Sequence, residues 1–226
     1  MITGVGREGQ VGETLASSFC EAGARVAAVD LSREVVARAA ALVDAGFDAR
    51  AFPCDLTDHA QTTALAMDLK ESYGQVDALV HGAGGFAMSG PVAESDPAVW
   101  TRMFAINLTS AYVATRALLP LLRVGGGAMV YFGSTAAIDG GKLAGMAAYA
   151  AAKSGVLTLM RTVAQEEARH GIRSNAIAPV AVRTTANIES MGSNARYVSR
   201  EEVAAVARFL CSEDSARITG QVIVMA

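Results

Sequence analysis

Three residues in the middle of the chain carry a hydroxyl, a phenol and an ammonium group. Ser134 follows an apolar run, and Tyr149 and Lys153 lie four positions apart in an alanine-rich segment. Alanine favours helix, and residues four apart on a helix are neighbours on one face. A substrate carbonyl that reached this face would meet the phenol and the ammonium together. The pattern indicates a site that moves a proton to or from that oxygen.

Proton transfer by a tyrosine near neutral pH requires help from its surroundings. A free phenol has a pKa near 10, which is too high for a group that must both give and take a proton. An ammonium one helical turn away favours the phenolate, so we expect Lys153 to lower the pKa of Tyr149. An accidental pair on a solvated helix is the alternative, and Thr135 is a second candidate for the hydroxyl.

The amino terminus contains a glycine-rich loop between a strand-like start and an amphipathic helical pattern. Gly4, Gly9 and Gly12 precede apolar residues at helical spacing, among them Leu15 and Phe19. Glycines let the backbone approach a pyrophosphate, and the N-terminus of the following helix supplies free N–H groups. We therefore expect this loop to bind a dinucleotide.

An acidic residue ends the next apolar strand. Asp30 follows Ala24–Val29, about 20 residues beyond the glycine loop, where a carboxylate accepts hydrogen bonds from the adenosine ribose. The same charge repels a 2′-phosphate, so NAD(H) is preferred. Arg7 and Arg33 mean that NADP(H) is not excluded, and a cap for the next helix, shared with Ser32, is the other role for Asp30.

Apolar segments alternate with helical patterns along the whole chain. Strands are predicted at Ala24–Val29, Ala49–Pro53, Ala78–His81, Ala128–Gly133, Ser174–Ala178 and Val222–Met225. This alternation predicts an α/β fold, a Rossmann-type doubly wound parallel sheet of about seven strands with helices on both faces. With 226 residues and 52% hydrophobic content, we expect a single domain over residues 1–226.

The order of these motifs resembles that of the classical short-chain dehydrogenase/reductase family, and in particular its 3-oxoacyl reductases, over essentially the whole chain. The resemblance implies that Ser134, Tyr149, Lys153 and Asn107 are the catalytic residues. It also implies a short substrate lid near residues 185–199. The implied cofactor-binding residues are Gly4, Gly9, Gln10, Val11, Gly12, Asp30, Leu31, Asp55, Leu56, Gly82, Ala83, Gly84, Tyr149, Lys153, Pro179, Val182 and Thr184.

The implied function is that of an NAD(P)-dependent oxidoreductase, which transfers a hydride between the nicotinamide and a ketone or secondary alcohol. Tyr149 gives or takes the proton, Ser134 polarises the substrate oxygen, Lys153 also binds the nicotinamide ribose, and Asn107 supports a proton relay. The alternative is a non-catalytic NAD(H)-binding regulatory or scaffold protein of the same fold. A sugar-nucleotide epimerase ranks lower, because the chain is short for an extra substrate domain.

Several positions depart from the family pattern. The glycine loop carries an extra residue and has Gln10 near a usual glycine, and Val180 stands where a glycine is usual. His81 replaces an asparagine, and we expect it to be a packed or hydrogen-bonded turn residue. Only two residues precede Thr3, so we expect either a very short first strand or upstream residues that this sequence lacks.

Charge and composition restrict the partners. A net charge of −3 without a basic block argues against nucleic acid and membrane. Three scattered cysteines fit a reducing, cytoplasmic location, and neither they nor the histidines have metal-ligand spacing. We find no signal peptide and no spanning apolar run.

The remaining apolar segments predict the substrate and the assembly. Phe86, Met88 and Met146, with apolar lid residues, predict a small-molecule carbonyl or alcohol of modest hydrophobicity as substrate. The stretch 97–122 is apolar on more than one face, which predicts a homotetramer or homodimer.

Overall fold

A seven-stranded sheet forms the centre of the computed structural model, which describes residues 1–138 and 140–226. The strand order is β3-β2-β1-β4-β5-β6-β7, and neighbouring strands run parallel. The chain runs outward from β1 to β3 and then crosses back to β4, so its direction reverses between β1 and β4. This arrangement confirms the predicted doubly wound sheet. The strands are β1 (Ile2–Thr3), β2 (Val26–Asp30), β3 (Ala49–Pro53), β4 (Ala78–His81), β5 (Gly127–Phe132), β6 (Ile172–Pro179) and β7 (Val222–Met225).

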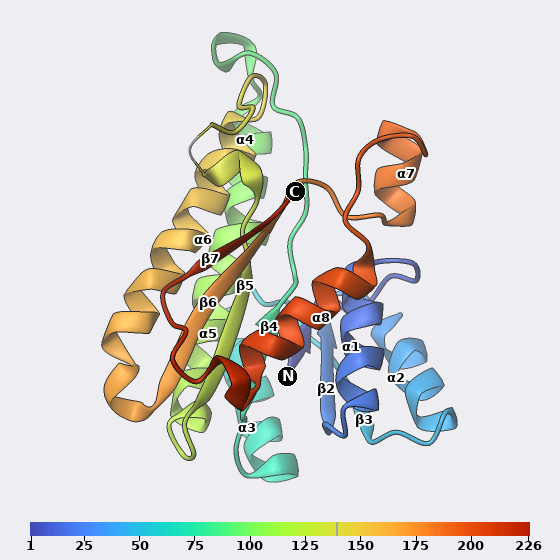
Figure 1. The fold of residues 1–226 in the computed structure, drawn as a ribbon, viewed down its shortest axis with the longest axis vertical. Helices are drawn as coiled ribbons and strands as arrows, with labels where there is room; N and C mark the ends of the chain where they lie inside the picture. The colour runs from blue at the N-terminus through green and yellow to red at the C-terminus, as the bar shows by residue number, and fades with distance from the viewer. Residues whose placement is uncertain (139) are drawn as a thin grey trace.

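Helices cover both faces of the sheet, as Figure 1 shows. On one face lie α1, α2 and α8, and on the other α3, α5 and α6. Two further helices, α4 and α7, lie toward the carboxyl ends of the strands. The helices are α1 (Val11–Glu21), α2 (Val35–Asp44), α3 (His59–Tyr73), α4 (Pro97–Phe104), α5 (Ser110–Leu122), α6 (Ala147–Glu166), α7 (Thr185–Met191) and α8 (Arg200–Cys211).

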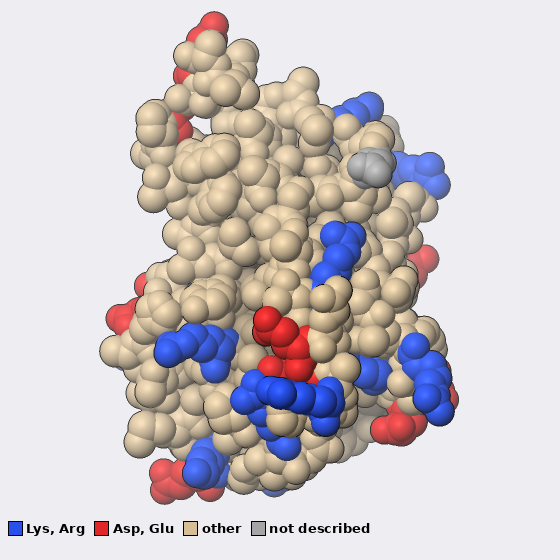
Figure 2. All heavy atoms as spheres, turned by 90° about the vertical axis from the view of Figure 1, so that its left-hand side faces the viewer, with Lys and Arg blue, Asp and Glu red and all other residues tan. Residues whose placement is uncertain are grey.

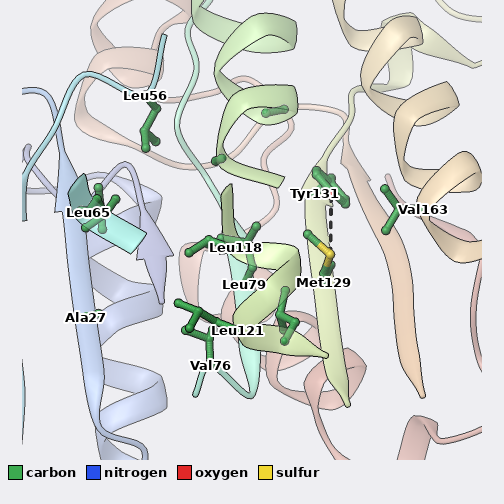
Figure 3. Packing of buried hydrophobic residues seen from close by; sticks show 14 of the residues in the cluster. Ala27, Leu56, Leu65, Val76, Leu79, Leu118, Leu121, Met129, Tyr131 and Val163 are labelled. Atoms are coloured by element: carbon green, nitrogen blue, oxygen red, sulfur yellow. Dashed lines mark hydrogen bonds between the residues drawn. The ribbon is translucent and has the colours of Figure 1, made fainter. Parts of the chain in front are cut away.

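The inner strands contribute side chains to a separate apolar core on each face. Along β2, Ala27 and Val29 belong to the core under α3, α5 and α6, whereas Val26 and Ala28 belong to the core under α1 and α8. The alternation follows from the two-residue period of a strand. Strands buried on both faces carry continuous apolar runs, which explains why the strands were predictable. Figure 3 shows the first of these cores.

The long helical stretch Pro97–Leu122 changes pitch in its middle. Between α4 and α5, residues Ala105–Thr109 form a π-helical turn. By length and composition the stretch could span a membrane, which corrects the expectation of no spanning apolar run, but 50% of its most apolar window is buried inside the protein. Such burial is typical of a core helix.

The first strand is only two residues long, although it lies in the middle of the sheet. The N-terminal ammonium donates a 2.7 Å hydrogen bond to the Ala78 carbonyl, and burial lowers the pKa of this amine from 8.0 to about 6. A cavity of about 280 Å³ lies beside Met1, lined by the starts of β2 and β4, by Phe19 and by Tyr73. β1 is therefore very short in this sequence.

Lengthening β1 by a Val-Val extension upstream of Met1 is expected to stabilise the protein. In the register that pairs Ile2 with Ala28 and Val80, the added residues continue along β2 and β4 into the cavity. Burying one such apolar side chain contributes about 1.5 kcal/mol, so the extension should raise Tm by about 5 °C. Thermal unfolding measures this change, and an Asp-Pro extension is the control, because proline cannot donate to a strand ladder.

The extension also has an expected pH signature. In the unextended chain the terminal amine loses its proton near pH 6 when folded and near 8.0 when unfolded. The unfolded state therefore binds more protons across this interval, and stability rises as the pH increases through it. The Val-Val extension should remove this increase in stability with pH. An unchanged Tm and an unchanged pH dependence would show that the cavity does not accept a strand.

Candidate active site

The carboxyl ends of three central strands meet where the strand order reverses. Gly4 follows β1, Gly82 follows β4, and Ser134 lies just beyond β5. Ligands of open α/β sheets bind at this edge. Tyr149 and Lys153 approach the same edge from the first turns of α6. The topology thus brings the predicted catalytic and dinucleotide-binding residues to one end of the sheet.

Tyr149 and Lys153 lie on one face of α6, as their spacing predicts. Lys153 Nζ is 5.9 Å from the centre of the Tyr149 ring and donates a 2.8 Å hydrogen bond to the Phe132 carbonyl at the end of β5. Phe86 packs edge-on against the phenol, with ring centres 5.0 Å apart. The ammonium is buried, since Lys153 is only 7% exposed. A phenol and an ammonium therefore share one confined place.

Burial dominates the electrostatics of this pair. It raises the pKa of Tyr149, and the Ser134 hydroxyl acts in the opposite direction. Burial also lowers the pKa of Lys153 to about 8. The lower phenol pKa that the spacing predicts is therefore not seen in this structure, because desolvation outweighs the effect of Ser134. The ammonium is instead bonded to the Phe132 carbonyl.

Ser134 begins the short turn that follows β5. Its Oγ accepts a 3.2 Å hydrogen bond from the Ala136 N–H, and it caps the 3₁₀ turn Thr135–Ala137. The Ser134 side chain also partly offsets the effect of burial on the pKa of Tyr149, which is consistent with a position near the phenol. Thr135 begins the 3₁₀ turn that Ser134 caps.

Asn107 lies in the π-helical turn between α4 and α5. Its Nδ2 donates 3.0 Å hydrogen bonds to the carbonyls of Gly85 and Met103, and its Oδ1 accepts the Gly85 N–H at 3.2 Å. A Cβ atom on Gly84 would lie 2.6 Å from Oδ1 and 3.5 Å from Lys153 Nζ. Asn107 thereby fastens the loop after β4 beside Lys153. π-helical turns are frequent at functional sites.

His81 is a buried structural residue, as predicted. Its Nδ1 is 3.2 Å from Thr3 Oγ1, and its Nε2 is 3.4 Å from Ser110 Oγ. Burial, reinforced by the Lys153 charge, lowers the pKa of His81 to about 3. The ring thus stays neutral near neutral pH and links β1, β4 and α5.

The glycine loop packs closely on the turn after β4. Gly4 has a φ of +82°, and a Cβ atom on it would lie 2.8 Å from the Gly82 backbone. A Cβ atom on Gly12 would collide with the Gly4 carbonyl. Ala83 of the same turn donates a 3.0 Å hydrogen bond to Thr3 Oγ1. These positions require glycine, which leaves backbone groups uncovered by side chains for a diphosphate.

The residues that begin α1 differ in part from the prediction. Gln10 is the N-cap, but its side chain makes no capping hydrogen bond, and Val11 is the first helical residue. Instead, Glu13 Oε2 accepts the Gly9 N–H at 2.7 Å. The sequence-based prediction omitted Glu13, although a glutamate in the first turn of a helix is a capping signal.

The N-cap of α2 is Glu34, without a side-chain capping hydrogen bond, so the capping role considered for Asp30 is wrong. Asp30 Oδ2 accepts the Gly6 N–H at 2.9 Å, and its Oδ1 accepts the Ser32 N–H at 2.8 Å. Each carboxylate oxygen can accept a further hydrogen bond. The neighbouring Leu31 is 70% exposed. An acceptor at a strand end beside close-packed glycines fits the ribose of a dinucleotide.

The two residues expected at the adenine end occupy different surroundings. Asp55 Oδ1 accepts hydrogen bonds from the Thr57 N–H at 2.8 Å and the Thr57 hydroxyl at 2.7 Å, in the turn after β3. Leu56 is 5% exposed and packs into the core. A cofactor contact at position 56 would therefore involve the backbone.

The segment after β6 forms a closed loop that carries its own helix. Pro179 ends β6, and Val182 pairs with Val198 across the base of the loop. Thr184 caps α7 through its side chain. The Tyr197 hydroxyl lies 2.7 Å from the Gly192 carbonyl and closes the loop from inside. The predicted lid is thus a compact helical segment.

Known proteins resemble this chain over nearly its whole length. A family model described as enoyl-(acyl carrier protein) reductase matches residues 4–226. 2-(S)-Hydroxypropyl-CoM dehydrogenase 3 of Xanthobacter autotrophicus is 33% identical, over 93% of this chain and 88% of that protein. The structure of an NAD⁺-bound xylitol dehydrogenase is 26% identical with a TM-score of 0.91, and covers 100% of this chain and 96% of its own.

A second solved structure binds the other nicotinamide cofactor. Gluconate 5-dehydrogenase of Burkholderia cenocepacia, in complex with NADP and tartrate, is 27% identical with a TM-score of 0.91, over 99% of this chain and 91% of its own. These three proteins are named as dehydrogenases, and each match covers at least 93% of this chain. The chain belongs to the short-chain dehydrogenase/reductase family and is an oxidoreductase that acts on alcohol or carbonyl groups with a nicotinamide cofactor.

Proposed function

We propose that Tyr149 is the proton donor and acceptor of this oxidoreductase. The supporting observation is that Lys153 Nζ lies 5.9 Å from the centre of the Tyr149 ring, while the Ser134 side chain partly offsets the effect of burial on the pKa of the phenol. In the reductive direction Tyr149 donates its proton to the substrate oxygen, and in the oxidative direction it accepts that proton. Ser134 donates a hydrogen bond to the same oxygen and so orients the substrate. These roles separate proton transfer from the hydride transfer that the bound nicotinamide supplies.

Lys153 and Asn107 support the phenol in this proposal. The buried ammonium has a pKa of about 8, so it is charged at neutral pH and stabilises negative charge on the phenolate during turnover. It also binds the nicotinamide ribose. Asn107 holds the Gly84–Gly85 backbone beside the ammonium and supports the path by which the proton leaves. The cofactor-binding residues proposed with them are those predicted from the sequence.

NAD(H) is the proposed cofactor, because the charge of Asp30 at the end of β2 would repel a 2′-phosphate on the ribose that it is proposed to bind. Asp30→Ala should weaken NADH binding about tenfold through the loss of a charged acceptor for the ribose hydroxyls. NADPH binding should weaken less or improve, because the repulsion disappears. Fluorescence titration with each nucleotide measures both constants, and Asp44→Ala, an exposed acid on α2, is the control. Tighter binding of NADPH than NADH by the unmodified protein would refute the preference.

The loop after β4 supports a small, uncharged substrate of modest hydrophobicity. Phe86 contacts the phenol, and the Ser89 N–H bonds to the Gly145 carbonyl at 2.8 Å, so this loop folds over the start of α6. A Cβ atom on Gly145 would lie 2.8 Å from Met88 Cε. These apolar groups surround the approach to Tyr149. The proposed substrate class is tested by screening polyols, secondary alcohols, ketones and 3-oxoacyl thioesters with both nucleotides. If the protein turns over none of these compounds, the proposed class is refuted.

We also propose a cytoplasmic homotetramer or homodimer that binds neither nucleic acid nor membrane. Trp100 and Phe104 stack with centres 4.7 Å apart, and Trp100 and Tyr112 are 47% and 48% exposed. Exposed aromatic groups of this kind favour interfaces. Figure 2, viewed from the side of α6, shows few charged groups over the upper half of the molecule. Sedimentation equilibrium tests the assembly, and a monomer at micromolar concentration would contradict it.

A further inference from the structure

We propose that Glu13 is a positioning residue that couples the glycine loop to the lid. In this arrangement, cofactor binding at the loop and closure of the lid favour one another. The inference rests on the proposed binding of a dinucleotide at the glycine loop. It goes beyond that proposal because Glu13 need not touch the cofactor or the substrate.

Glu13 holds the glycine loop through a backbone hydrogen bond. Its Oε2 accepts the Gly9 N–H at 2.7 Å. Gly9 has a φ of +71°, a left-handed conformation that turns the adjoining peptide groups. The carboxylate therefore helps to set the direction of the peptide groups that face a bound diphosphate.

Two arginines from other elements meet the same carboxylate. Arg38 Nη1 of α2 lies 3.0 Å from Glu13 Oε1 and 3.2 Å from Glu8 Oε2. Arg200 Nη1, at the start of α8, lies 3.8 Å from Glu13 Oε2. The side chains of Glu13, Arg38 and Arg200 are 30%, 23% and 29% exposed, so water screens these pairs less than it screens pairs on the open surface. One carboxylate thus links α1, α2 and α8.

Each end of the lid lies beside Glu13 or the Gly9 peptide that Glu13 holds. At the first end, the Thr185 N–H donates a 3.3 Å hydrogen bond to the Gly9 carbonyl, and a Cβ atom on Gly9 would collide with Thr185 Oγ1. At the other end, Ser199 caps α8, whose first residue is Arg200. A cavity of about 170 Å³ lies between these contacts, lined by residues of the loop, the lid and α8. The first end of the lid therefore meets the glycine loop at Gly9. The other end leads into Arg200, which pairs with Glu13.

A change in charge at Glu13 should disturb the loop and the lid together. The carboxylate partly neutralises Arg38 and Arg200 while it holds Gly9. Without that charge the two guanidinium groups lose their common partner, and the lid loses its attachment near Arg200. When a change at one site alters binding at another, the two sites share a coupling free energy. Each site then affects the other by the same amount. Weaker cofactor binding should thus accompany faster opening of the lid.

The variant Glu13→Gln tests this coupling with little change in shape. The amide oxygen can still accept the Gly9 N–H, whereas the charge is lost. We expect the Kd for NADH to rise about fivefold, as for the loss of partly screened ion pairs. Trypsin should also cleave the lid faster at Arg196. The control is Glu21→Gln, because Glu21 is exposed at the end of α1 and forms no ion pair within the described residues.

The outcomes distinguish the coupling from a structural role and from failure of the proposed function. In an Arg200→Met background, Glu13→Gln should weaken NADH binding less than it does alone, because part of the interaction is already absent. Equal NADH affinity and equal lid cleavage in Glu13→Gln and the unmodified protein would overturn the proposal. A lower Tm with unchanged NADH affinity would also overturn it. If the unmodified protein binds no NADH, the proposed function fails, and the coupled effect on cofactor binding is refuted with it.

Discussion

Replacing Tyr149 with phenylalanine is expected to lower kcat about 10³-fold, the scale of a general acid–base contribution. The change removes the hydroxyl that exchanges a proton with the substrate and keeps the ring that packs edge-on against Phe86. The Kd for NADH should remain nearly unchanged, because Lys153 and the glycine loop are untouched. Steady-state kinetics and fluorescence titration measure the two quantities separately.

A second tyrosine provides the control for this prediction. Tyr112→Phe removes a hydroxyl from the exposed face of α5, where the side chain is 48% exposed, and its kcat should match that of the unmodified protein. Retention of full activity by Tyr149→Phe would remove the phenol from the mechanism. In that event the Ser134 hydroxyl, which partly offsets the effect of burial on the pKa of the phenol, would be the next proton donor to test.

Replacing Lys153 with methionine should abolish most of the activity while making the protein more stable. Without the ammonium, the phenolate loses its nearest positive charge, so kcat/KM should fall about 10³-fold, and NADH binding should weaken through the lost ribose contact. Burial lowers the pKa of Lys153 from 10.5 to about 8, so the folded protein carries a desolvated charge at neutral pH. Its removal should raise the free energy of unfolding by about 2 kcal/mol, after allowance for the lost hydrogen bond to Phe132.

The pH dependence of the unmodified protein follows from the same group. The folded protein releases the Lys153 proton near pH 8, whereas the unfolded chain holds it to about 10.5. Stability should therefore rise with pH between these values, while the rate of ketone reduction should fall above about pH 8 because the ammonium is lost. Lys153→Met should lose both effects, and Lys142→Met, at an exposed position, should keep both. A Lys153→Met protein that unfolds more easily, with the pH–rate profile unchanged, would contradict the assigned role.

The sequence predicted the fold and the edge of the sheet where the site lies. Buried parallel strands are continuous apolar runs, which is why β2 and β4 were found at nearly their observed bounds. The pairing of Tyr149 with Lys153 depends only on helical spacing, so it was also predictable. The position of Asp30 at the carboxyl end of β2 was predictable, because an acidic residue follows the glycine loop at a fixed distance in this pattern.

What could not be predicted depends on burial and on contacts between distant segments. The raised pKa of Tyr149 results from desolvation that only the folded protein produces. The clamp of Asn107 on Gly85 joins segments that local sequence does not relate. The meeting of Arg38 and Arg200 at Glu13 likewise depends on the packing of three helices.

The most direct test of the central claim follows a labelled hydride. A ketone substrate found in the panel would be incubated, in a single turnover, with NADH that carries deuterium at the transferable C4 position. The unmodified protein should move the label to the carbinol carbon, whereas Tyr149→Phe should bind the same NADH and transfer label about 10³-fold more slowly. Transfer at equal rates by the two proteins would show that the proton of Tyr149 has no part in the reaction.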